Sequence, residues 1–231
     1  MKSLQVVTPH KECIYDCKFC ISKMHKHDNK FVNNYELNKE LWKNNLIKII
    51  KENKDLKYVV ITGTNEPMQS EDCVRDIIDV VRSTNKEINI EIQTHFYKEN
   101  SLYNDIDVVA YSISNPFLLD KIIPSGKISR YVLILTDSFN NYKLDDILKL
   151  IPKNVTQITF KSLQLGEEHN KVYDYILNHS ISKNTFNKLK ENINNYKGNL
   201  SIRLDNNCMD SINRYKIYRE DGNLYDSWSD D

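Results

Sequence analysis

Three cysteines near the N-terminus are the residues best suited to chemistry. Cys13, Cys17 and Cys20 form a C-x-x-x-C-x-x-C run directly after the short apolar stretch Leu4–Val7. Thiolates are soft ligands that hold iron–sulfur clusters or zinc. A cubane cluster bound by only three cysteines leaves one iron without a protein ligand, and a reacting molecule could bind there. The run therefore predicts a metal site at these three cysteines.

Two other interpretations of the cysteine run stay open at this point. A zinc site needs a fourth ligand, which His10 or His25 could supply to complete a tetrahedral structural site. The three cysteines could also share the inner face of a helix as small buried residues. With only five cysteines in the chain, metal binding is favoured over helix packing. Cys73 and Cys208 lie far from the run and do not suggest a disulfide framework.

Length and charge restrict the fold and the partners. A chain of 231 residues can bury one large core, so we expect a single domain over residues 1–231. Lys+Arg and Asp+Glu both number 32, and this balance gives no global field that would attract a nucleic acid. The sequence has no apolar run that could span a bilayer, and Met1–Ser3 does not begin a leader. We expect a cytoplasmic protein with no membrane or nucleic-acid partner.

Short β-branched runs alternate with helical patterns along residues 1–165, which is typical of parallel βα units in an α/β fold. The second run, Lys57–Thr62, is continuously apolar and is expected to be buried on both faces. Six strands are expected, at Leu4–Thr8, Lys57–Thr62, Ile88–Thr94, Asp107–Ser114, Arg130–Leu135 and Thr156–Ser162. Between these strands, helices are expected at Glu36–Asn53 and at Leu144–Ile151. A further helix is expected to begin after Ser70, which can cap it, and to bury one stripe formed by Val74, Ile77, Ile78 and Val81.

The pattern changes over residues 166–231. Helices are expected at Glu167–Asn178 and Ser182–Asn195, followed by a strand at Leu200–Leu204. Asp221 and Gly222 separate two short aromatic runs, which predicts a β-hairpin. We expect this tail to close the open side of the sheet.

The cysteine run resembles that of the radical S-adenosylmethionine superfamily when it is taken together with the loop Thr62–Pro67, Thr-Gly-Thr-Asn-Glu-Pro. The resemblance covers about residues 1–165 and implies a partial (βα)6 barrel, with a short helical and β-hairpin tail after it. It also implies one [4Fe–4S] cluster on Cys13, Cys17 and Cys20, with S-adenosylmethionine at the open iron. Asn65 stands where the family has a second glycine, and a left-handed conformation, which asparagine tolerates, would keep the loop.

The resemblance implies cofactor-binding residues around the cluster. Backbone groups of Gly63 and Thr64, with Asn65 beside them, would hold the amino group of S-adenosylmethionine, and Phe19 is the aromatic residue before the last cysteine. Ser112 and Ser114 lie on one face at the end of the fourth strand. Similar enzymes bind the ribose or the methionine carboxylate at this place. The alternative is that both serines make only local hydrogen bonds. Gln93 is a further candidate.

Two polar residues at strand ends are candidate catalytic groups. His95 follows the third strand and Lys161 lies on the sixth, among apolar residues where an unpaired charge would be costly. Active-site groups of parallel barrels come from these carboxyl ends of the strands. Glu66 precedes Pro67 and is expected to support its loop instead of acting as an acid or base.

A narrower resemblance concerns the substrate. The segments Thr8–Cys17 and Ile21–His27, with the compact aromatic tail, resemble the small queuine lyases of salvage pathways. This implies a small-molecule substrate, with cleavage of a carbon–nitrogen bond in queuine to release 7-aminomethyl-7-deazaguanine, and an electron donor such as flavodoxin or ferredoxin. The deazaguanine edge presents N–H donors that a carboxylate should accept. The candidates are Asp137, Glu167, Asp205 and Asp231.

Two alternatives to the lyase stay open. Activating enzymes that install a glycyl radical on a partner protein also resemble this chain in their short barrel and their Thr-Gly-Gly-Glu-Pro-like loop. A zinc-stabilised binding module is the alternative outside the enzymes.

Overall fold

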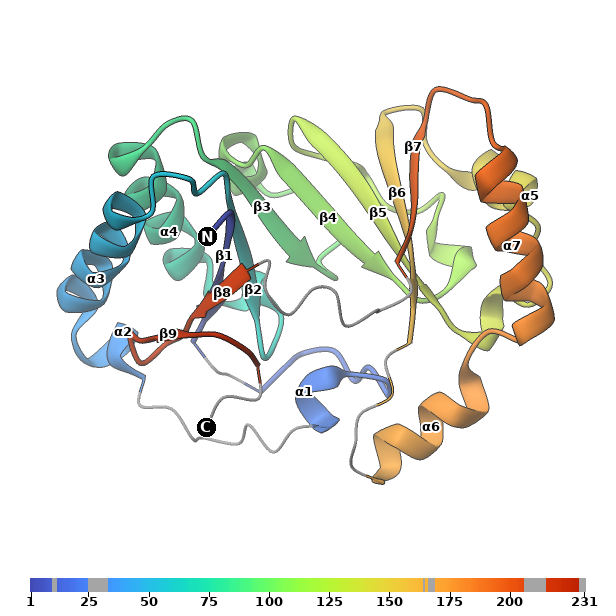
Figure 1. The fold of residues 1–231 in the computed structure, drawn as a ribbon, viewed down its shortest axis with the longest axis horizontal. Coiled ribbons are helices and arrows are strands. Elements are labelled where there is room, and N and C mark those ends of the chain that lie inside the picture. Colours follow the sequence, from blue (N-terminus) through green and yellow to red (C-terminus); the bar gives the residue numbers. More distant parts are fainter. Residues whose placement is uncertain (10–11, 25–32, 164, 166–168, 206–214, 229–231) are drawn as a thin grey trace.

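The computed structural model describes residues 1–9, 12–24, 33–163, 165, 169–205 and 215–228, which form one nine-stranded sheet in the order β7-β6-β5-β4-β3-β2-β1-β8-β9. All neighbouring strands are parallel except β8 and β9. Figure 1 shows the sheet as a curved surface, with α3 and α4 against one end and α5 and α7 against the other. The α/β partial barrel predicted from the sequence is confirmed.

The six expected strands are all present, with ends within two residues of the predicted ones. In β2, Val59 and Ile61 are fully buried, whereas Tyr58 is 46 % exposed. Burial of this strand on both faces was therefore wrong, because Val60 and Thr62, on the same face as Tyr58, are only partly buried. The six strands are β1 (Ser3–Thr8), β2 (Tyr58–Gly63), β3 (Asn89–Thr94), β4 (Val108–Ile113), β5 (Ile128–Leu135) and β6 (Val155–Ser162).

Most helices begin at a polar cap residue. The helix expected over Glu36–Asn53 is two helices, because Asn38 ends the first and accepts a hydrogen bond from the Leu41 amide, at 3.2 Å, to begin the second. Ser70 occupies the cap position of α4, but its side chain makes no capping bond. The helices are α1 (Ile21–Met24), α2 (Asn34–Leu37), α3 (Lys39–Glu52), α4 (Glu71–Thr84), α5 (Leu144–Leu150), α6 (Lys171–His179) and α7 (Lys183–Asn195).

The main core lies between the outer face of the sheet and these helices. The four residues of the predicted α4 stripe are all buried, and Cys73 beside them is a core residue as expected. Apolar side chains of the strands meet this stripe, so the outer face supplies most of the buried apolar area. Among the described residues, no helix is both long and apolar enough to cross a membrane.

Within the described residues, the tail extends both edges of the sheet instead of closing its open side. Strand β7 (Ser201–Asp205) pairs with β6, whereas β8 (Tyr215–Tyr218) pairs with β1 at the other edge. The predicted hairpin is confirmed, with β9 (Leu224–Tyr225) antiparallel to β8 and Gly222 at φ 80° in the turn. Trp42 of α3 holds this edge, since its indole N–H donates to the Arg219 carbonyl at 3.0 Å.

Candidate functional site

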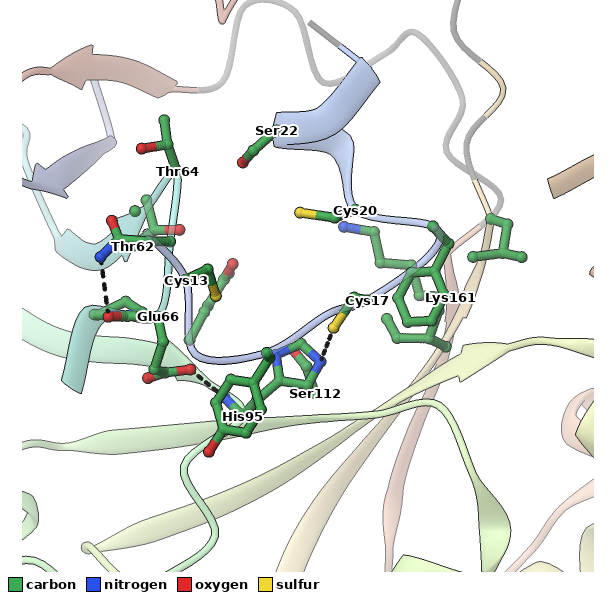
Figure 2. Close-up of a pocket in the computed structure, with 18 of the residues that line it drawn as sticks. Cys13, Cys17, Cys20, Ser22, Thr62, Thr64, Glu66, His95, Ser112 and Lys161 are labelled. Atoms are coloured by element: carbon green, nitrogen blue, oxygen red, sulfur yellow. Dashed lines mark hydrogen bonds between the residues drawn. The ribbon is translucent and has the colours of Figure 1, made fainter. Parts of the chain in front are cut away.

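A cavity of about 220 Å³ lies at the carboxyl ends of the central strands. Figure 2 shows the cysteine loop passing around it, with His95 on one side and Lys161 on another. The structure therefore brings most of the predicted site residues together, although their roles as ligands stay predictions. The predicted residues that line the cavity are Cys13, Cys17, Phe19, Cys20, Gly63, Thr64, Asn65, Gln93, His95, Ser112 and Lys161.

The cysteine loop is tied to the segment that follows β2. The Gln69 side chain accepts a hydrogen bond from the Ile14 amide at 3.2 Å and donates to the Glu12 carbonyl at 2.9 Å. The Cys20 amide donates to the Cys17 carbonyl at 3.2 Å, which tightens the second half of the loop. Sequence reasoning missed Gln69, because nothing in the local pattern indicates a contact with residues 55 and 57 positions earlier.

The donor set suits an iron–sulfur cluster. Burial raises the pKa of the Cys17 thiol to about 11, and the neighbouring Cys20 and Cys13 reinforce that rise. A cluster would reverse this preference, because coordinating thiols are deprotonated by the metal. Among the described residues, no three cysteine, histidine or carboxylate side chains lie close enough together to bind one metal ion. The cysteine ligands of a [4Fe–4S] cluster bind different irons and therefore lie further apart. The zinc ligands considered above, His10 and His25, lie outside the described residues.

Glu66 supports the loop, as expected. Its carboxylate is 3 % exposed and accepts hydrogen bonds from the Thr94 hydroxyl at 2.5 Å, the His95 amide at 2.8 Å and the Met68 amide at 3.1 Å. Burial raises the pKa of Glu66, and these three donors oppose the rise. Because its oxygens are occupied by the protein's own groups, Glu66 holds the ends of β2 and β3 together.

Gly63 is required by close packing at the end of β2. A Cβ atom at this position would lie 2.7 Å from the Thr8 hydroxyl and 2.9 Å from the Asn65 carbonyl. Asn65 is 8 % exposed, and its side-chain amide donates to the Glu66 carbonyl at 3.5 Å. Within the described structure, the Thr8 hydroxyl and the Asn65 side-chain oxygen are buried without a partner. Such buried polar atoms favour a polar ligand beside Gly63.

The candidate catalytic groups differ in environment. The His95 Nε2 lies 3.9 Å from the Cys17 Sγ, and desolvation by the surrounding protein lowers the pKa of His95 to about 4. The imidazole is therefore neutral near pH 7. Lys161 lines the cavity, and in the strand register it lies opposite Asp205 of β7. Of the two serines, Ser112 lines the cavity, whereas the Ser114 carbonyl accepts hydrogen bonds from two hydroxyls of the next loop.

The candidate substrate carboxylates are dispersed. Asp137 does not line the cavity, and it pairs with His179 at 2.9 Å. Asp205 ends β7 next to Lys161 and is exposed. Glu167 and Asp231 lie outside the described residues. Within the described part of the chain, the cavity lining contains no carboxylate except Glu66.

Several lining residues were not predicted. Tyr15, Ser22, Ser162 and Leu163 line the cavity, and the Tyr15 ring lies 5.7 Å from the His95 ring. Along the cysteine loop, exposed residues alternate with partly buried ones, and Tyr15 is on the partly buried side with Cys13 and Cys17. The loop sequence does not indicate this alternation. Leu163 and Phe19 pack on buried residues of α6, so the tail supports one wall of the cavity.

The fold was compared with those of known proteins. The chain superimposes on the crystal structure of Streptococcus suis SuiB bound to S-adenosylmethionine with a TM-score of 0.63 and 12 % sequence identity, over 98 % of this chain. The fold is similar to that of SuiB. SuiB bound to the precursor peptide SuiA gives a TM-score of 0.60 at 12 % identity over 97 % of this chain. The chain spans about 60 % of the length of SuiB. No family model matches the sequence, and no curated protein does.

Proposed function

We propose that this chain is a radical S-adenosylmethionine enzyme. The observation that carries the proposal is that Cys13, Cys17 and Cys20 line one cavity together with the Gly63 loop. When bound, a [4Fe–4S] cluster with S-adenosylmethionine supplies one electron to a carbon–sulfur bond, giving methionine and a 5′-deoxyadenosyl radical. The similarity to SuiB, which was crystallised with S-adenosylmethionine, supports the proposal at the level of the fold.

The chain's own residues position the reactants and exclude water. Gly63 gives the backbone a close approach, and the buried oxygens of Thr8 and Asn65 lie where a cationic amino group would find acceptors. Phe19 and Leu163 form an apolar wall held by α6. A radical that abstracts hydrogen from many carbons requires a site that excludes water and fixes the substrate.

We further propose that the substrate is queuine and that the reaction is a lyase reaction. The radical takes one hydrogen from the cyclopentenediol carbon next to the amine-bearing carbon and becomes 5′-deoxyadenosine. The carbon–nitrogen bond then breaks to an alkene, and a second electron with one proton completes the amine of 7-aminomethyl-7-deazaguanine. Both electrons come from a reduced donor such as ferredoxin or flavodoxin. Lys161 lines the cavity and is the candidate for delivering that proton.

The test is a single turnover under anaerobic conditions. Reconstituted protein is mixed with S-adenosylmethionine, dithionite and queuine, and products are separated by mass. We expect about four irons per chain, 5′-deoxyadenosine and the aminomethyl base. 5′-Deoxyadenosine without a change in queuine would discard the lyase and keep the superfamily, and a protein that binds zinc and no iron would discard both.

Peptide modification is the second candidate function. The structure of SuiB bound to the precursor peptide SuiA gives the observation that favours it. Glycyl-radical activation belongs to the same class of macromolecular substrate. Incubation with S-adenosylmethionine, dithionite and a peptide deuterated at its glycine α-carbons separates it from the lyase, because only a peptide substrate would transfer deuterium into 5′-deoxyadenosine.

A further inference from the structure

A polar cluster crosses the inner face of the sheet below the cavity. Arg130 of β5 donates from Nη1 to the Glu91 carboxylate of β3 at 2.6 Å and from Nε to the Gln157 side chain of β6 at 2.8 Å. The Glu91 side chain is 10 % exposed and that of Arg130 is 25 % exposed. None of these three residues was singled out by the sequence patterns.

The cluster lies on the same face as the cavity. Glu91 is two residues before Gln93 on β3, and Arg130 is four residues before Ile134 on β5, so alternation places each pair on one face. Gln93 and Ile134 both line the cavity. In the register of the sheet, Ala110 alone separates Gln93 from Arg130. Its methyl group leaves room for the Arg130 side chain to reach across β4.

The arrangement leaves hydrogen-bonding capacity on the cavity side of the sheet beside Gln93, which lines the cavity, whereas Glu91 and Arg130 are not themselves lining residues. The Gln93 amide is 3.5 Å from the second Glu91 oxygen, a long contact that a ligand could replace. Within the described part of the chain, only Nε and Nη1 of Arg130 donate to protein groups, so Nη2 keeps its donors for a ligand.

We propose that Glu91, positioned by Arg130, accepts the two neighbouring N–H donors of a guanine-like base. Gln93 and the free Arg130 N–H groups donate to the carbonyl oxygen of the same base edge. This inference rests on the proposed function for its substrate class. Glu91 thus takes the role that the sequence predicted for Asp137, Glu167, Asp205 or Asp231. It lies on the cavity side of the sheet, about 7 Å along β3 from Gln93.

The test compares two probes on the full-length reconstituted protein by calorimetry. The probes are 7-aminomethyl-7-deazaguanine and its analogue without the 2-amino group. The variant is Glu91→Gln, and the matched control is Asp107→Asn, which breaks an ion pair with Arg82 at 2.6 Å in which the Asp107 side chain is 13 % exposed. Asp107 lies before β4, at the opposite end of the sheet from the cavity.

The expected result is that the wild type and Asp107→Asn bind the complete base about tenfold or more tightly than the analogue. Glu91→Gln should lose this discrimination while S-adenosylmethionine binds as before. If Glu91→Gln fails to fold, the double variant Glu91→Gln/Arg130→Gln, which removes both charges, is expected to lose the discrimination between the two bases in the same way.

Three outcomes would overturn the inference. They are undiminished discrimination in Glu91→Gln or in the Glu91→Gln/Arg130→Gln double variant, equal loss in Asp107→Asn, and a wild type that binds neither base. Binding of S-adenosylmethionine and formation of 5′-deoxyadenosine are measured on the same samples. A wild type that makes 5′-deoxyadenosine but binds no base therefore removes this inference and the lyase, and it leaves the radical chemistry in place.

Discussion

The two faces of the sheet differ in chemistry although alternate residues of the same strands form them. On β5, Tyr131, Leu133 and Leu135 are fully buried under helices, whereas Arg130 and Ile134 on the inner face are half-buried. These outer positions of β5 exclude water, whereas the inner face of the sheet carries polar groups such as the Arg130–Glu91 ion pair. The fold thus depends on one set of residues and the proposed chemistry on the other.

Breaking the cysteine loop should have the largest functional effect. Cys17→Ser replaces a soft thiolate with a hydroxyl, and we expect iron content and 5′-deoxyadenosine formation to fall to background. Iron analysis and product assays after reconstitution measure both. The matched control is Cys73→Ala, which removes a buried core thiol on the outer side and should keep the iron. Equal iron in Cys17→Ser and the wild type would refute the assignment.

Adjacent residues of β6 test the difference between the faces directly. Phe160 is fully buried on the outer side, so Phe160→Ala should lower the free energy of unfolding by about 3–5 kcal/mol. Lys161→Met keeps the apolar stem on the cavity side, and we expect a change of under about 1 kcal/mol with a tenfold or greater loss of turnover. Urea unfolding and single-turnover rates measure the pair. The comparison fails if Lys161→Met destabilises as much as Phe160→Ala.

The outer face was easier to predict than the inner one. Apolar alternation and the 3.6-residue period located the strands and the α4 stripe, since both follow from burial on one side. The spacing of Cys13, Cys17 and Cys20 indicated a metal site because three thiols lie within eight residues, and the Gly63 loop was proposed from the family resemblance. Glu91 and Arg130 were not found because their contact joins residues 39 positions apart, and local patterns contain no record of such pairs. The docking of β8 on β1 depends on a similarly distant pairing.

A smaller effect should separate loop support from metal binding. Gln69→Ala removes both hydrogen bonds to the cysteine loop while all three thiols remain. We expect iron to load normally but to be lost several-fold faster to a chelator, because the loop opens more often. Chelation kinetics followed by absorbance measure this. An unchanged rate would show that Gln69 does not hold the loop, and Gln69→Glu, which keeps only the acceptor, should give an intermediate rate.

The smallest effect concerns the ion pair at the opposite end of the sheet. Burial opposes ionisation of Asp107, but Arg82 and Lys127 outweigh it and hold the pKa of this carboxyl below its usual value. A lowered folded-state pKa stabilises the protein above the unfolded pKa of about 3.9, and the gain is lost as pH falls through the folded value.

Asp107→Asn should therefore lower the free energy of unfolding by about 1–3 kcal/mol at pH 7 and by progressively less below about pH 4. Urea unfolding of cluster-free wild type and variant at pH 7 and at pH 3.5 gives the difference at each pH. A difference that stays constant to pH 3 would show that the Asp107 charge does not stabilise the fold. Because Asp107 lies away from the cavity, base discrimination should be unaffected even where stability falls, which separates the cost of breaking an ion pair from the loss of a ligand-binding carboxylate.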